Sequence, residues 1–137
     1  MRDLAEKLIL KHEGKRNRAY QDSKGIWTIG VGHDLESNPI SDEAVKQILK
    51  DDITDVEQWL NTLQWFYDLD SVRQAVIIDM TFNLGRRGLM KYHRMIKALE
   101  NKNYLNAADE MLDSKAGRNL KSRYTELAEI MRTGEMI

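Results

Sequence analysis

One segment, residues 17–35, interrupts a chain whose other apolar residues recur at helical spacing. Its aromatic and β-branched residues are separated by Asp22-Ser23-Lys24-Gly25 and by Gly30 and Gly32. Glycine readily adopts the positive φ angles that tight turns require, so the segment predicts a β-hairpin. No other stretch has this pattern, and any sheet in the fold is therefore expected here.

Helices are expected on both sides of the hairpin. In residues 3–12, Leu4, Leu8 and Ile9 share one face, and Gly14 is placed to end the helix. Ser41 is a natural N-cap for a second helix, which is expected to run to about residue 64.

The second half of the chain is expected to be helical throughout. Asp70 or Ser71 caps a helix that Gly85 closes. Shorter helices are expected near residues 89–100, 103–113 and 119–133, the last closed by Gly134.

Together these elements predict an α+β fold with a single domain over residues 1–137. A small β-hairpin lobe takes up about residues 13–40. A larger helical lobe takes up about residues 65–137 plus the N-terminal helix. The long helix joins the two lobes, and a ligand cleft is expected between them.

The composition excludes several classes of protein. The chain has no cysteine, and no stretch approaches the roughly 20 apolar residues of a membrane helix. The N-terminus lacks a signal-peptide core, so synthesis in the cytoplasm without stable membrane insertion is expected. The net charge is −1, and no nucleic-acid motif is present. The three histidines lack zinc-ligand spacing, so no metal or cofactor is expected.

Two carboxylates and a hydroxyl flank the hairpin. Glu13 stands at the C-terminal end of the first helix, where the dipole disfavours negative charge, as suits a general acid. Asp22 stands at the hairpin corner and Thr28 on the second strand. Hydrolysis of a glycosidic bond usually needs such a carboxyl pair. The alternatives are a surface Glu, a turn-forming Asp and an ordinary strand Thr.

These residues resemble those of the phage-type lysozymes, a family of glycoside hydrolases. In that family a Glu, an Asp and a Thr at this spacing lead into Thr-Ile-Gly-x-Gly-His, which here is Thr28 to His33. Two further segments resemble the central helix and the C-terminal helix end of the family. They are Asp70-Ser71-Val72-Arg73 with Met80-x-Phe82-Asn83-x-Gly85, and Arg132-Thr133-Gly134.

The resemblance implies an N-acetylmuramidase that cuts the β-1,4 bond between N-acetylmuramic acid and N-acetylglucosamine with inversion, and so lyses bacteria. Glu13, Asp22 and Thr28 would be catalytic. Arg123 aligns with a family arginine that orients the catalytic acid. Five residues are expected to bind substrate: Gly32, His33, Asp34, Phe82 and Asn83. The alternative for His33 is a structural histidine that pins the hairpin to the first helix, and the alternative for Phe82 is a plain core aromatic.

The expected partners follow from the same resemblance. They are peptidoglycan glycan strands, with a holin that would release the protein from the host cytoplasm to the periplasm. A monomer is expected. The three tryptophans are expected in the core, although Trp27 beside Thr28 could touch a sugar.

Two rival functions stay open. One is a lysozyme-like domain that binds peptidoglycan, or serves as a scaffold, with weak or no hydrolysis. It is motivated by a short stretch from Asp34 to Ile40 and by unusual acids at Asp34 and Asp79. Asp79 is either buried and protonated or faces the cleft. The other is a lytic transglycosylase, which needs an acid but no water-placing Asp22.

Overall fold

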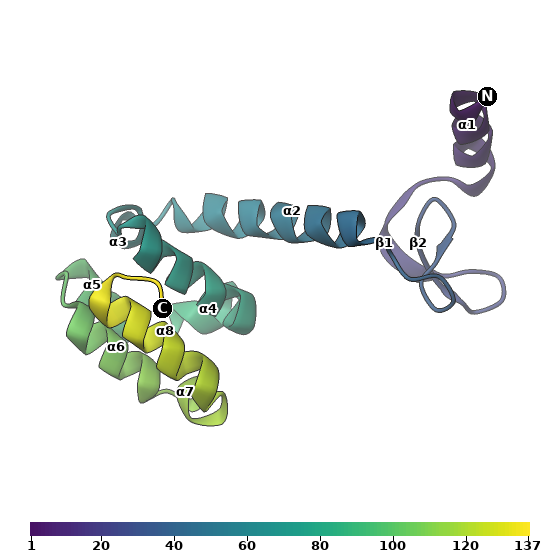
Figure 1. The fold of residues 1–137 in the computed structure, drawn as a ribbon. Coiled ribbons are helices and arrows are strands. Elements are labelled where there is room, and N and C mark those ends of the chain that lie inside the picture. The colour runs from purple at the N-terminus through teal and green to yellow at the C-terminus, as the bar shows by residue number, and fades with distance from the viewer. The chain divides into compact units, whose positions relative to one another are not determined.

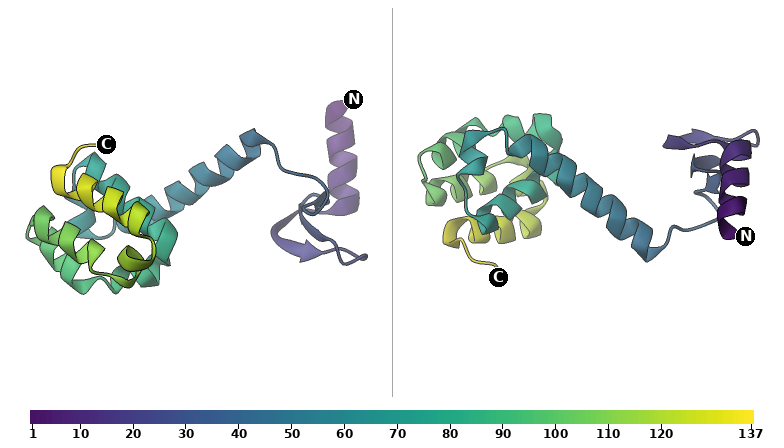
Figure 2. Two further views of the ribbon diagram at one scale, coloured as in Figure 1. Left: turned by 60° about the horizontal axis from the view of Figure 1, so that its bottom comes forward. Right: turned by 90° about the horizontal axis from the view of Figure 1, so that it is seen from above.

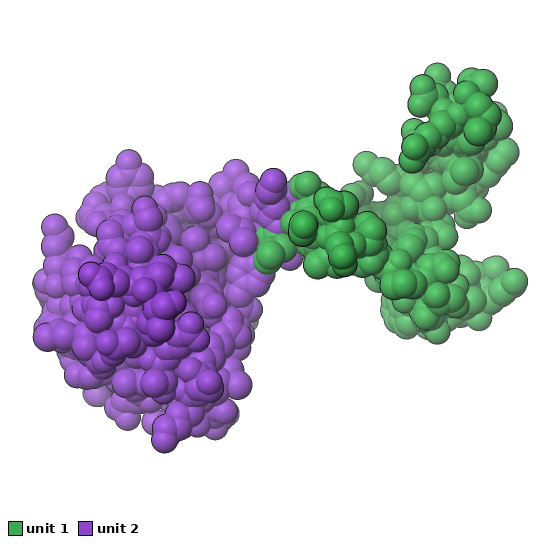
Figure 3. Space-filling model, viewed as in Figure 1, with its two compact units in different colours: residues 1–49 green, residues 50–137 purple.

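The computed structural model describes all 137 residues, with eight helices and one three-stranded antiparallel sheet. The predicted α+β class is therefore confirmed (Figure 1). Contacts divide the chain into two compact units, residues 1–49 and residues 50–137 (Figure 3). Each unit is described by itself below.

The first helix, α1 (Arg2–Glu13), ends where the sequence predicts. Gly14 adopts a φ of 74°, and its N–H donates to the Leu10 carbonyl at 2.9 Å. No residue of α1 is buried, and Leu4 and Leu8 are 65 % and 57 % exposed. The assignment of this helix to the helical lobe stays a prediction.

The sheet contains one strand more than a hairpin. Strand β1 (Arg16–Gln21) pairs with β2 (Trp27–Gly30), and β2 pairs with the short β3 (His33–Asp34). Tyr20 lies opposite Thr28, and Thr28 lies opposite Asp34. Thr28 is thus in the middle of the sheet, which explains why it is one of the few buried polar residues.

Helix α2 (Asp42–Leu60) begins after Ser41, whose Oγ accepts from the Ala44 N–H at 3.1 Å, as an N-cap should. The helix ends at Leu60, earlier than expected. The N–H groups of Thr62 and Leu63 donate to carbonyls three residues back, which tightens the chain into a turn. A short helix, α3 (Gln64–Tyr67), follows that turn.

Five further helices complete the second unit: α4 (Ser71–Met90), α5 (His93–Glu100), α6 (Tyr104–Leu112), α7 (Lys115–Asn119) and α8 (Lys121–Thr133). Asp70 caps α4 by accepting from the Arg73 N–H, and Gly85 interrupts the helix with a φ of 74°. Gly134 ends α8 in the left-handed conformation, as predicted. The prediction lacked the short helices α3 and α7.

The core belongs to the second unit, where α8 packs against α6, α4 and α7 and where α5 packs against α6 (Figure 2). None of its helices combines the length and the apolarity that crossing a bilayer requires. The largest fully buried side chains are Leu60, Phe66, Val76, Ile77, Met80, Leu89, Met95, Met111, Tyr124 and Met131.

Candidate active site

The carboxyl group of Glu13 lies against the turn that joins β2 to β3. A Cβ atom built on Gly32 would lie 3.1 Å from Glu13 Oε2, 3.2 Å from its Cδ and 3.4 Å from its Cγ. Glu13 itself is exposed at the end of α1. The predicted acid is thus accessible to solvent and beside the glycine-rich segment that the sequence singled out.

Asp22 organises the corner of the β1–β2 hairpin. Its Oδ1 accepts from the Lys24 N–H at 2.8 Å and from the Ile26 N–H at 2.9 Å. The turn-forming alternative is therefore correct. Both of these bonds go to Oδ1, which leaves Oδ2 outside the turn. The catalytic role of Asp22 is compatible with this geometry and stays a prediction.

Thr28 is 4 % exposed, and its Oγ1 donates to the Ile26 carbonyl at 2.9 Å. The hydroxyl proton is therefore committed to the protein, and the oxygen can still accept a hydrogen bond. The neighbouring Trp27 is 48 % exposed, so the expectation that it belongs to the core is wrong. Trp27 and Thr28 are consecutive residues of β2, so their side chains point to opposite faces of the strand.

His33 and Asp34 hold the loop that follows the sheet. His33 Nε2 lies 3.0 Å from the Asn38 carbonyl, so no bond ties this histidine to α1. Asp34 Oδ1 accepts from the N–H groups of Glu36 and Ser37 at 2.8 and 3.0 Å. The backbone hydrogen bond from Ser37 is the main cause that lowers the pKa of the Asp34 carboxyl.

Sequence reasoning missed the part that Glu36 plays in this loop. Glu36 Oε2 accepts from the Trp27 N–H at 2.7 Å, so the loop after β3 reaches back to the start of β2. Nothing in the spacing of Glu36 signals this contact. It depends on the path of the loop, which Asp34 sets through its own turn.

Arg123 makes its ion pair within the second unit. Its Nη2 lies 2.7 Å from Asp79 Oδ1, its Nε donates to the same oxygen at 2.9 Å, and its Nη2 donates to the Asp79 carbonyl at 3.2 Å. The Asp79 side chain is 43 % exposed and paired with Arg123, so the alternative of a buried Asp79 is wrong. The acid-orienting role of Arg123 stays a prediction.

Phe82 and Asn83 lie next to each other on α4 in different environments. Phe82 is 42 % exposed, so the alternative of a plain core aromatic is wrong. Asn83 Oδ1 accepts from the hydroxyl of the fully buried Tyr124 at 2.8 Å. Burial, the largest cause, raises the pKa of Tyr124 to about 12. The amide nitrogen of Asn83 is still available as a donor.

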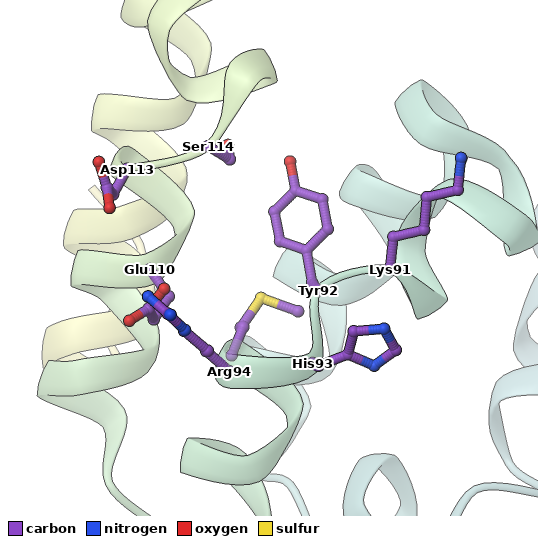
Figure 4. Close-up of a pocket in the computed structure, with 8 residues that line it drawn as sticks. Lys91, Tyr92, His93, Arg94, Glu110, Asp113 and Ser114 are labelled. Atoms are coloured by element: carbon purple, nitrogen blue, oxygen red, sulfur yellow. The ribbon is translucent and has the colours of Figure 1, made fainter.

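Several pockets lie within the second unit. One of about 520 Å³ includes Asn83 and Leu120 in its lining, and one of about 230 Å³ includes Asp79 and Arg123. A third, of about 320 Å³, lies where α5 begins and α6 ends (Figure 4). None of the predicted site residues lines it, and its walls carry Lys91, Tyr92, His93, Arg94, Met95, Glu110, Asp113 and Ser114.

No three histidine, aspartate or glutamate side chains gather in an arrangement that could hold a metal ion. Nor does any buried side-chain nitrogen or oxygen lack a hydrogen-bond partner. The hairpin carries the carboxylate of Asp22 and the hydroxyl of Thr28, and the carboxylate of Glu13 lies beside Gly32. Such groups can transfer protons, orient water and stabilise positive charge.

Comparison with known proteins agrees with this chemistry. The phage lysozyme family matches residues 10–125. The endolysin of Salmonella phage P22 is 32 % identical over 120 aligned residues, which cover 81 % of each chain. An endolysin from Acyrthosiphon pisum secondary endosymbiont phage 1 is 34 % identical, with 83 % of this chain and 80 % of the relative covered. A probable T4-type lysozyme of Dictyostelium discoideum is 25 % identical and is covered over 94 % of its length, with 93 % of this chain.

A mostly helical α+β fold with one small antiparallel sheet is consistent with a lysozyme-like fold. The match over residues 10–125 is to one family of lysozyme-like hydrolases, the phage lysozymes. The chain belongs to the phage lysozyme family, and it is an enzyme, a lysozyme-type peptidoglycan hydrolase.

Proposed function

We propose that the protein is an N-acetylmuramidase that cleaves the β-1,4 bond between N-acetylmuramic acid and N-acetylglucosamine and inverts the anomeric carbon. Glu13 gives its proton to the glycosidic oxygen as the C1–O bond breaks. The oxygen of a water molecule bonds to C1, and Asp22 takes the proton that this water loses. One water is consumed for each bond that is cut.

The observation that carries this proposal is the position of the Glu13 carboxyl against Gly32. Its Oε2 lies 3.1 Å from the point where a Cβ added to Gly32 would stand. It puts the acid beside the same short sheet that holds Asp22 and Thr28. Glu13 is exposed at the C-terminal end of α1 and forms no ion pair. This exposure suits a proton donor, which needs access to the polymer.

Asp22 and Thr28 suit the handling of water. Asp22 Oδ1 is held by two backbone donors, which fixes the carboxylate and leaves Oδ2 to accept a proton. The Thr28 hydroxyl donates inward, so its oxygen accepts from a water molecule. Both residues therefore serve the fold and the reaction together.

Substrate contacts are assigned on the same basis. Gly32, His33 and Asp34 present backbone groups along the turn and β3, where a sugar would pass the acid. The exposed Phe82 and Trp27 offer apolar faces to sugar rings, and the Asn83 amide nitrogen offers a donor. Arg123 is assigned to orienting the Glu13 carboxyl. In the cell, the monomeric protein would reach the peptidoglycan from the cytoplasm with the help of a holin.

The products test the bond, the water and the stereochemistry at once. Purified peptidoglycan is digested in water enriched in oxygen-18, and the released fragments are analysed by mass spectrometry and proton NMR. We expect new N-acetylmuramic acid reducing ends that carry the label and form first as the α anomer. New N-acetylglucosamine ends would contradict the bond assignment, and a first-formed β anomer would contradict inversion.

The same experiment separates the rivals. Fragments that carry an anhydro ring and no label would identify a lytic transglycosylase, because that reaction adds no water. Sedimentation with peptidoglycan and no fragments would identify a binding domain.

A further inference from the structure

We propose that Gly32 is a positioning residue for the acid: the missing side chain at this position makes the space in which the Glu13 carboxyl stands. This inference rests on the proposed function, since it matters for catalysis only if Glu13 is the proton donor. It gives Gly32 a role separate from its predicted contact with substrate.

The contact involves the reacting end of the Glu13 side chain. A Cβ on Gly32 would lie 3.1 Å from Oε2 and 3.2 Å from Cδ, both closer than an ordinary van der Waals contact. The three atoms nearest to this Cβ all belong to the Glu13 side chain. A methyl group here would therefore displace the carboxyl and leave the helix in place.

The displacement should cost little stability and should lower the catalytic rate. Glu13 is exposed, so its side chain can rotate away from the methyl at small cost in stability. General acid catalysis, however, needs the proton within hydrogen-bond reach of the leaving oxygen. A Cβ at these distances requires the carboxyl to move by a few tenths of an ångström. A shift of about 1 Å in a reacting group can cost roughly 100-fold in rate, so this smaller shift should cost less.

Gly30 provides a matched control on the same sheet. Its φ is +69° against +67° for Gly32, so alanine meets the same backbone strain at either position. A Cβ on Gly30 would have nothing within 4 Å. The difference between Gly32→Ala and Gly30→Ala therefore isolates the contact with Glu13.

The experiment measures kcat, KM and melting temperature for both variants on soluble peptidoglycan fragments, together with their crystal structures. We expect similar losses of melting temperature. We expect Gly32→Ala to lose a further several-fold, up to about 10-fold, in kcat at an unchanged KM. Its Glu13 carboxyl should be displaced, whereas that of Gly30→Ala should not.

Each other outcome has a distinct meaning. An undisplaced carboxyl with equal kcat in the two variants, or a kcat loss without displacement, overturns the positioning role. A rise in KM alone overturns it in favour of a substrate contact. A displaced carboxyl with unchanged kcat leaves the contact intact but contradicts Glu13 as the acid.

Folding is controlled separately. Should Gly32→Ala fail to fold, Glu13→Ala is added to remove the atoms that the methyl would meet. Recovery of folding would place the conflict at Glu13 and support the inference. Continued failure, with Gly30→Ala folded, would place it in the backbone and overturn the inference.

Discussion

Arg123 and Asp79 form a two-point contact between α8 and α4, with Nη2 and Nε of the guanidinium at 2.7 and 2.9 Å from one carboxylate oxygen. Both side chains are about 40 % exposed. Arg123 is the arginine that the family resemblance assigns to orienting Glu13, and its guanidinium is paired with Asp79 instead. The charge of Asp79 therefore competes with any other carboxylate for this guanidinium.

Loss of that charge should have little effect on stability. For Asp79→Asn we expect a change of less than about 1 kcal/mol in the free energy of unfolding, because partly exposed ion pairs contribute little. The bond from Arg123 to the Asp79 backbone carbonyl survives the change. Urea unfolding measures it, and a loss of several kcal/mol would mean that the pair supports the core.

Asp22 allows its two roles to be separated. Asp22→Asn keeps an oxygen that can accept from Lys24 and Ile26, whereas Asp22→Ala removes it. We expect Asp22→Asn to keep the melting temperature and lose about 100-fold or more in kcat. Asp22→Ala should lose both, with about 1–2 kcal/mol of stability. Activity is measured as the fall in turbidity of a suspension of permeabilised cells, and near-full activity of Asp22→Asn would favour the transglycosylase.

Ionisation of Tyr124 should lower the stability of the protein in alkali. Its pKa is raised by burial from 10.0 to about 12, so the folded state resists ionisation that the unfolded chain undergoes freely. The stability that this hydroxyl contributes is fully present below pH 10 and is lost as the pH rises towards 12. Tyr124→Phe removes this loss along with the hydrogen bond to Asn83.

The measurement is the free energy of unfolding for parent and Tyr124→Phe at several pH values. We expect the advantage of the parent over the variant to shrink between pH 10 and about 12. A constant difference over that range would show that the hydroxyl ionises as readily in the folded protein as in the unfolded chain.

Substitution of Gly117 should have a large effect on the stability of the second unit. A Cβ there would lie 2.4 Å from the Met111 carbonyl oxygen and 2.7 Å from that of Leu112, and both are backbone atoms that cannot rotate away. Gly117→Ala should cost more than about 3 kcal/mol. Gly85→Ala, where φ is 74° and ψ is 168° and nothing lies within 4 Å, should cost roughly 1–3 kcal/mol from strain alone, because this backbone region is essentially restricted to glycine. Equal losses in thermal unfolding would contradict this account.

Helix ends were the most predictable part of the fold, because capping depends on the residue types at one or two neighbouring positions. Gly14, Ser41, Asp70 and Gly134 all act where the sequence places them. The short α7 was not predicted, since five residues are too few for a periodic pattern. Its N-cap, Ser114, which accepts from the Gly117 N–H, was the one available signal.

The site was predictable in its residue types and less so in its contacts. The glycine and serine next to Asp22 predict a turn there, and Asp22 Oδ1 indeed accepts from two N–H groups of that turn. The bond from Glu36 to Trp27 and the contact between Glu13 and Gly32 depend on how loop and helix approach the sheet. Such approaches leave no trace in local spacing. Trp27 was misplaced because its apolar character alone suggested the core.

The most direct test of the central claim is the clearing of permeabilised Gram-negative cells by the parent protein and by Glu13→Gln at equal concentration. Glu13 is exposed and its side chain makes no ion pair, so glutamine should leave the melting temperature unchanged. We expect rapid clearing by the parent and a loss of about 100-fold or more in the variant. Equal clearing by a folded Glu13→Gln would contradict the assignment of Glu13 as the acid.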